Sequence, residues 1–302
     1  RAVASKGYTE AITWSFTDSK VDNLFSEVKD EIRLSNPISS DLNVLRTSLY
    51  SNLLIGAKKN IHRNFEDLML FEIGPVFYEK EPGKQSTMIG AIKTGKYSRK
   101  NWIEKERSFD VFDIKNDVVK TLNEIGIDNS KISVSNKTKN WYHPGRSGLL
   151  SLSSPDGPEL AYFGEIHPSI IKKLDLRVEN VLGFEIILDN IPESRKKIRE
   201  AKPQFIISDY QKVIRDFAFV VDEKYSSGEI ITLVKNIDKD LIKNVKIFDV
   251  YQGENIEKEK KSIAFNVTFE PKDKTLSDED IERVSKKIIS LVQDATGATL
   301  RS

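Results

Sequence analysis

The feature that most constrains this chain is a polar stretch, PESRKKIREAKPQ at residues 192–204, which divides it into two parts. The stretch holds two prolines, five basic residues against two acidic ones, and few apolar side chains. That composition is typical of a linker rather than of a packed element. We therefore predict a linker over 192–208 between a domain at 1–191 and a smaller domain at 209–302.

The part after the linker has the pattern of a ferredoxin-like domain. Periodicity predicts strands at 213–221, 244–251, 261–269 and 298–301, and helices at 227–234 and 277–294. The order βαββαβ is the ferredoxin-like order. In the third strand, apolar side chains from Ile263 to Phe269 alternate with small ones from Ser262 to Thr268. The second set would face solvent or, as an alternative, a flat partner such as unstacked bases.

The first domain is strand-rich, with short turns between its strands. Strands are expected at 8–17, 67–79, 86–94, 147–153, 159–166 and 181–188, and helices at 42–60, 110–126 and 169–174. Consecutive strands favour an antiparallel sheet over alternating β and α units, so the expected class is α+β.

Several kinds of chemistry are excluded by residue type. The chain has no cysteine, which removes disulfides and thiolate sites and fits a reducing compartment. Its histidines, His62, His143 and His167, show no metal-ligand spacing, so no metal is expected. GAIKTGKYS at 90–98 resembles a phosphate-binding loop, but Tyr97 replaces the required hydroxyl and no helix follows. No apolar run approaches the ~18 residues of a membrane span.

Two local stretches have alternative interpretations. WYHPGRSG at 141–148 is interpreted as a tight turn in which Arg146 bridges to a carboxylate, with a ligand pocket as the alternative. The stretch 93–107 carries six basic residues against two acidic ones, with Tyr97 and Trp102 among them. A solvated loop is favoured there over contact with an RNA backbone. The net charge of +1 allows a local basic patch of this kind, but no global polycation.

Nine segments, in order along the chain, resemble the C-terminal half of the β subunit of bacterial phenylalanyl-tRNA synthetase. They are GYTEAITWSF, LSNPISSDLNVLRTSL, FEIGPVF, HPGRSG, FGEIHP, RDFAFVVDE, FDVYQG, KKSIAFNVTF and the terminal GATLR. The resemblance implies a non-catalytic, class II synthetase-like antiparallel module at 1–191 and a ferredoxin-like anticodon-binding domain at 209–302. It also implies further domains before Arg1.

The same resemblance implies the partners. An α subunit would bind ATP, with magnesium, and phenylalanine in a cytoplasmic (αβ)2 heterotetramer that charges tRNA(Phe). This chain itself would bind no cofactor, membrane or DNA. The sequence agrees about the missing chemistry. No R-x-E follows the helix at 42–60, where class II enzymes carry the arginine of their second motif, and the G-x-G-x-G-x-x-R motif is missing as well; these arginines stabilise phosphate charge. We expect no catalytic activity from this fragment alone.

Five residues of the second domain are the candidate RNA contacts, because they lie on or beside predicted strands. Cations there could reach phosphates and a tyrosine could stack on a base. The five are Lys212, Arg215, Tyr251, Lys261 and Arg301.

Arg46 and Arg146 are interpreted as structural or interface residues. Arg46, in LNVLRTSLYSNLL, is expected at the head of a helix, paired with a carboxylate in the fold or across a subunit interface. A rival function from a different class is an amino-acid-sensing module, in which a ferredoxin-like regulatory domain binds its ligand at helix and loop interfaces.

Overall fold

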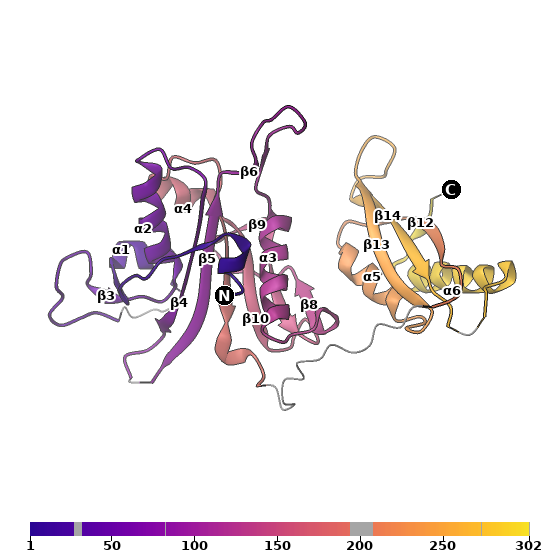
Figure 1. The fold of residues 1–302 in the computed structure, drawn as a ribbon, viewed down its shortest axis with the longest axis horizontal. Helices are drawn as coiled ribbons and strands as arrows, with labels where there is room; N and C mark the ends of the chain where they lie inside the picture. The colour runs from indigo at the N-terminus through magenta and orange to yellow at the C-terminus, as the bar shows by residue number, and fades with distance from the viewer. Residues whose placement is uncertain (27–31, 82, 194–207, 273, 302) are drawn as a thin grey trace. The chain divides into compact units, whose positions relative to one another are not determined.

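The computed structural model describes residues 1–26, 32–81, 83–193, 208–272 and 274–301. The chain forms two compact units, Arg1–Ile198 and Arg199–Ser302 (Figure 1). Most of the predicted linker, 194–207, lies outside the described residues.

The first unit is built on a seven-stranded sheet in the order β1-β4-β5-β11-β10-β9-β8. Strand β1 runs parallel to β4, and every other neighbouring pair is antiparallel. In sheet order, the strands are β1 (Thr9–Glu10), β4 (Leu68–Phe77), β5 (Gln85–Thr94), β11 (Leu182–Ile187), β10 (Glu159–Ile166), β9 (Tyr142–Leu152) and β8 (Ile132–Ser135). The antiparallel α+β expectation for this part is confirmed.

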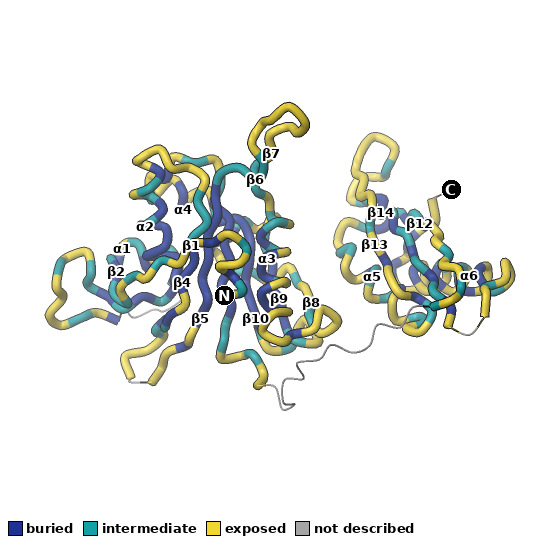
Figure 2. The backbone as a smooth tube through the Cα atoms, in the orientation of Figure 1, coloured by how far each residue is buried: buried dark blue, intermediate teal, exposed yellow. Residues whose placement is uncertain are grey.

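Helices cover both faces of this sheet, and the strands between them are buried (Figure 2). Helices α2 (Tyr50–Ile61) and α4 (Pro168–Lys173) pack over one face, where Leu53 and Ile170 share a core with Ile92. Helix α3 (Val111–Glu124) packs over the other, where Val118 joins Phe184. The smaller elements are α1 (Ser19–Asp22), the strand pair β2 (Phe16–Thr17) and β3 (Val44–Leu45), the strand pair β6 (Lys96–Ser98) and β7 (Arg107–Ser108), and the 3-10 turns Ala4–Lys6, Asn129–Lys131 and Leu188–Asn190.

The helix predicted at 42–60 begins only at Tyr50, so the prediction was wrong for its first turns. Residues Val44–Leu45 pair with β2 as a strand instead. The carboxylate of Asp22 then accepts hydrogen bonds from the Thr47 N–H at 3.0 Å and the Ser51 hydroxyl at 2.9 Å. A distant carboxylate thus ties the segment before α2 to the first turn of the helix. Arg46 therefore precedes the helix rather than heading it.

Two further predictions were wrong locally. The strand expected at 8–17 is split between β1 and β2, which belong to different sheets. The HPGR turn lies inside β9, where it forms a bulge: Tyr142 pairs with Ile166 and Ser147 with Gly164, so four residues face a single one. Proline has no N–H to give to a ladder, which favours a bulge at this point.

The second unit has the predicted ferredoxin-like order. Its elements are β12 (Val213–Asp222), α5 (Ser227–Lys235), β13 (Ile242–Tyr251), β14 (Lys260–Phe269), α6 (Asp278–Thr296) and β15 (Thr299–Leu300). The sheet order is β13-β14-β12-β15, antiparallel throughout. Capping boxes start both helices, at Ser226 and Ser277, and Gly297 ends α6 in a left-handed conformation.

No helix among the described residues is long and apolar enough to cross a membrane.

Candidate nucleic-acid and subunit interfaces

The four-stranded sheet of the second unit has one face covered by helices and one open face. On the covered face, Phe219 and Phe265 share a core with Ile230 of α5 and Ile288 of α6. Residues paired across a ladder point to the same side, so the opposite face carries the alternate residues of β14 and their partners. On this open face, Asn266 lies opposite Lys246, which is exposed.

Tyr251 and Arg301 come together on the open face. Tyr251 pairs with Ser262 across β13 and β14, and the Arg301 N–H donates to the Ala218 carbonyl at 2.8 Å, beside β12. The Arg301 guanidinium carbon lies 6.0 Å from the centre of the Tyr251 ring, and its Nη1 donates to the Ser262 hydroxyl at 3.4 Å. Ser262 is buried beneath them, although its place in the strand predicted exposure.

This pair has the chemistry of a nucleotide contact. The Tyr251 side chain is 38% exposed and Arg301 is exposed, so one partner can stack on a base while the other meets a phosphate. The guanidinium is held against an aromatic ring and a hydroxyl, with no carboxylate bound to it among the described residues. Its charge therefore remains available to an anion.

The other three candidate RNA contacts do not join this pair. The Lys212 ammonium lies 3.2 Å from the Glu270 carboxylate. The Lys261 ammonium donates to the Glu223 carbonyl at 2.9 Å. Arg215 is exposed, but it pairs with Val267 and so lies on the helix-covered side. Lys246 is not among the five candidates, although strand alternation places it on the open face.

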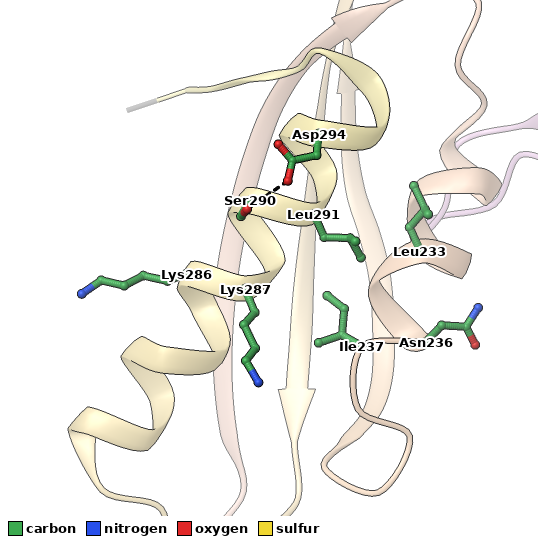
Figure 3. Close-up of a pocket in the computed structure, with 8 residues that line it drawn as sticks. All are labelled: Leu233, Asn236, Ile237, Lys286, Lys287, Ser290, Leu291 and Asp294. Carbon is green, nitrogen blue, oxygen red and sulfur yellow. Dashed lines mark hydrogen bonds between the residues drawn. The ribbon is translucent and has the colours of Figure 1, made fainter.

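A groove lies between α5 and α6, on the opposite side of the same unit (Figure 3). It has a volume of about 750 Å³, and Leu233, Ile237 and Leu291 point into it. Polar side chains border the groove, among them Lys287 and Asp294. This is the kind of helix interface at which the amino-acid-sensing alternative would place a ligand.

Arg46 is buried in the first unit, with 1% of its surface exposed. Its Nη1 lies 2.7 Å from the Glu72 carboxylate and donates to the Thr13 hydroxyl at 3.0 Å, while its Nε donates to the Pro75 carbonyl at 3.0 Å. The guanidinium packs against Gly74, where a Cβ would overlap it. The carboxylate partner expected for Arg46 thus lies within the fold.

Arg146 also meets a carboxylate, at the β9 bulge. Its Nε and Nη2 donate to the two oxygens of Glu165 at 2.6 and 2.8 Å. This two-point geometry holds the guanidinium of a half-exposed side chain against β10.

Glu185 is a buried carboxylate close to the start of α2. It accepts hydrogen bonds from the Ser48 hydroxyl at 2.7 Å and the Leu49 N–H at 3.2 Å. Burial raises the pKa of Glu185 to about 7, against 4.5 for the unperturbed group. Such burial disfavours the charged form, so this carboxyl titrates near neutral pH.

Two of the histidines, which are far apart in the sequence, lie side by side in the fold. The rings of His143 and His167 are 6.5 Å apart and nearly parallel. The Nδ1 atoms accept backbone N–H groups, from Gly145 and Ser169 respectively. No group of three or more potential metal ligands occurs in the described part of the chain.

An apolar patch is exposed at the β1 edge of the first sheet. Ile12 is 91% exposed and Trp14 62% exposed, and Ile73 on the neighbouring β4 is 45% exposed. Glu10 pairs with Phe71, and the Ala11 N–H donates to the Phe71 carbonyl at 2.7 Å, so the segment that leads to Ile12 starts along β4. An apolar sheet edge of this kind is a typical protein-interaction surface.

Two family models match the chain. Residues 1–188 match the phenylalanyl tRNA synthetase beta chain CLM domain, and residues 208–301 match the ferredoxin-fold anticodon binding domain. The chain is 41% identical over 302 residues to the phenylalanine–tRNA ligase beta subunit of Rhodospirillum rubrum, covering 100% of this chain and 37% of that protein. It is 40% identical to the same subunit of Rickettsia bellii, again over 302 residues, covering 100% of this chain and 34% of that one.

Solved structures are also similar to the chain. One of them is a pyrrolysyl tRNA synthetase of Desulfitobacterium hafniense, with a TM-score of 0.46 and 14% identity over 63% of this chain and 61% of that one. The chain spans little more than a third of the length of the beta subunits it matches. The first family model covers more than half of the 302 residues, and the second covers most of the remainder. The chain therefore belongs to the phenylalanyl-tRNA synthetase beta chain family.

Proposed function

We propose that this chain is the non-catalytic portion of a phenylalanine–tRNA ligase β subunit. Its second unit binds the anticodon region of tRNA(Phe), and its first unit holds the β subunit in a cytoplasmic (αβ)2 assembly. The assembly uses ATP and magnesium to join phenylalanine to tRNA(Phe), and the α subunit carries that chemistry. The single observation that carries the RNA-binding role is the pairing of Tyr251 with Arg301 on an open sheet face.

The open face supports RNA binding through both shape and charge. A sheet face lined by small side chains such as Ala264 and Asn266 lets a base approach the ring of Tyr251. The charge of Arg301, and that of Lys246 on the same face, can neutralise phosphates. Proteins that bind single-stranded segments combine these two features, and loop nucleotides of a tRNA are such a segment.

The absence of catalysis is supported by the state of Arg46. An arginine that stabilises ATP must present donors to a phosphate. The donors of Arg46 are bound to Glu72, Thr13 and Pro75, and the side chain is buried. It therefore serves the fold rather than a nucleotide.

Assembly through the first unit is supported by the edge patch of Ile12, Trp14 and Ile73. Large apolar side chains on a sheet edge gain free energy when another chain covers them. We therefore assign this patch to a contact with the α subunit.

Reconstitution tests the proposed function. Purified α subunit is combined with the full-length β chain that contains these residues, and phenylalanine charging of tRNA(Phe) is measured. We expect charging by the combination and none by the 302-residue chain alone. Charging by this chain alone would contradict the proposal.

The groove between α5 and α6 favours a second candidate, an amino-acid-sensing module. Its apolar side chains Leu233, Ile237 and Leu291 could hold a small apolar ligand. Calorimetric titration of the chain with phenylalanine separates the two functions, because the proposed function predicts no heat of binding at this groove. Binding that a Leu291→Lys change abolishes would favour the sensor.

A further inference from the structure

We infer that the hairpin formed by β6 and β7 is a docking element for another protein subunit. The hairpin extends from the body of the first unit and ends in an exposed loop (Figures 1 and 2). At its tip, Trp102 is 92% exposed and Ile103 is 71% exposed. Tryptophan is among the residues that contribute most to protein interfaces, and a nearly complete exposure leaves its whole apolar surface available.

The tip is held in one conformation by its own hydrogen bonds. The side-chain oxygen of Asn101 accepts the N–H groups of Ile103 at 2.8 Å and Glu104 at 2.9 Å. The Asn101 N–H in turn donates to the Glu104 carbonyl at 3.2 Å, and the Ser98 hydroxyl donates to the Lys105 carbonyl at 3.3 Å. Because the loop is already ordered, binding through Trp102 loses less conformational entropy.

The stem is braced by ion pairs and by an aromatic contact. The Arg107 guanidinium lies 3.9 Å from the centre of the Tyr97 ring and donates to Asp113 at 2.7 Å. The Lys96 ammonium lies 2.9 Å from Glu106, and Arg99 is bound to Asp67. The contacts with Asp67, which precedes β4, and with Asp113 of α3 fix the hairpin to the body of the unit.

The same ion pairs favour a protein partner over RNA. The sequence pattern at 93–107 has the composition of an RNA-binding stretch, but carboxylates of this chain already bind Lys96, Arg99 and Arg107. A phosphate backbone needs such cations free. In addition, Ile103 is aliphatic and cannot stack on a base, whereas an apolar pocket in a protein can receive both tip side chains.

The remaining charges indicate the chemistry of the partner. Within the described part of the chain, Lys100 and Lys105 have no carboxylate within ion-pair distance, and they flank the tip. The complementary surface is an apolar pocket that receives Trp102 and Ile103 and is bordered by carboxylates. This inference rests on the proposed function, which places the first unit in contact with a second kind of subunit, and we assign the pocket to that subunit.

The test uses the full-length β chain and purified α subunit, with the dissociation constant of their complex measured by sedimentation of fluorescently labelled β chain. The variant is Trp102→Ala with Ile103→Ala, and the matched control is Phe65→Ala, a substitution at another exposed aromatic side chain of the same unit. We expect the double variant to weaken subunit binding about tenfold or more, as loss of an interface tryptophan does. The variant Lys100→Glu with Lys105→Glu should also weaken subunit binding, and this loss of affinity should be larger at low salt than at high salt.

Three outcomes would overturn this inference. The first is an unchanged subunit dissociation constant for Trp102→Ala with Ile103→Ala, while the unaltered chains assemble normally. The second is unchanged subunit binding together with weaker tRNA(Phe) binding, which would make the tip an RNA contact. The third is an equal loss in the Phe65→Ala control. If the unaltered chains themselves fail to assemble, the proposed function fails instead.

Discussion

Arg46 and Glu72 form an ion pair at 2.7 Å that is buried in the first unit, with side-chain exposures of 2% and 6%. The Thr13 hydroxyl bridges the two, since it donates to Glu72 and accepts from Arg46. A single guanidinium thereby connects the segment before α2, the segment after β1, and β4.

Removal of the arginine should destabilise the chain strongly. Arg46→Ala leaves the Glu72 charge buried without its partner, a change that costs about 3–5 kcal/mol in comparable buried pairs. Urea unfolding measures the loss. The control is Lys137→Ala, which breaks an exposed pair with Asp156 at 2.8 Å and should leave the unfolding midpoint nearly unchanged. Equal midpoints for the two variants would show that the buried pair is not structural.

Two glycines of the first unit should respond in opposite directions to alanine. Gly74→Ala places a methyl group against the Arg46 guanidinium and should destabilise the chain by about 1–3 kcal/mol. Gly56→Ala lies within α2, where nothing lies within 4 Å of the new methyl group, and should stabilise it by about 0.5–1 kcal/mol. Thermal unfolding of both variants tests the pair, and a loss of stability in each would contradict it.

The buried carboxyl of Glu185 predicts a pH dependence. The pKa of Glu185 is raised from 4.5 to about 7. Between these two pH values the folded chain therefore keeps a proton on Glu185 that the unfolded chain has released. Stability from this group is therefore full below pH 4.5 and falls as the pH rises to about 7. The full effect is about 3 kcal/mol at most.

Glu185→Gln tests this dependence, because the amide oxygen can still accept from Ser48 and Leu49 while the proton no longer titrates. The variant should match the unaltered chain near pH 4.5 and exceed it in unfolding free energy at pH 8. A difference that stays constant between these two pH values would show that Glu185 has the same pKa in both states.

The sequence predicted most of the elements, and the errors have local physical causes. The ferredoxin-like order followed from periodicity because β12, β14 and α6 each bury one regular face. Helix α2 was predicted eight residues too early, because the leucine spacing continues through a segment that pairs with β2 and is bound by Asp22. No local pattern predicts a hydrogen bond to a carboxylate that lies 25 residues away.

The candidate RNA contacts show the same limit. Charge and proximity to strands selected Lys212, Arg215 and Lys261 as readily as Arg301. Only the three-dimensional fold shows that the Arg301 side chain contacts Ser262 and Tyr251. Strand register likewise shows that Arg215 lies on the helix-covered side of the sheet, opposite Val267. The carboxylate partners of Lys212 and Arg46 also depend on tertiary contacts, which sequence spacing does not encode.

Binding of tRNA(Phe) to the assembled enzyme tests the open-face account most directly. The β chain carries Tyr251→Ala or Arg301→Ala, with Arg215→Ala as the control on the helix-covered side of the sheet. Loss of the stacking ring should weaken binding by about 1–3 kcal/mol, and loss of Arg301 should also lower the salt dependence by about one phosphate contact. Arg215→Ala should bind as the unaltered enzyme does. Unchanged affinity for Tyr251→Ala and Arg301→Ala, with a loss confined to Arg215→Ala, would contradict the account.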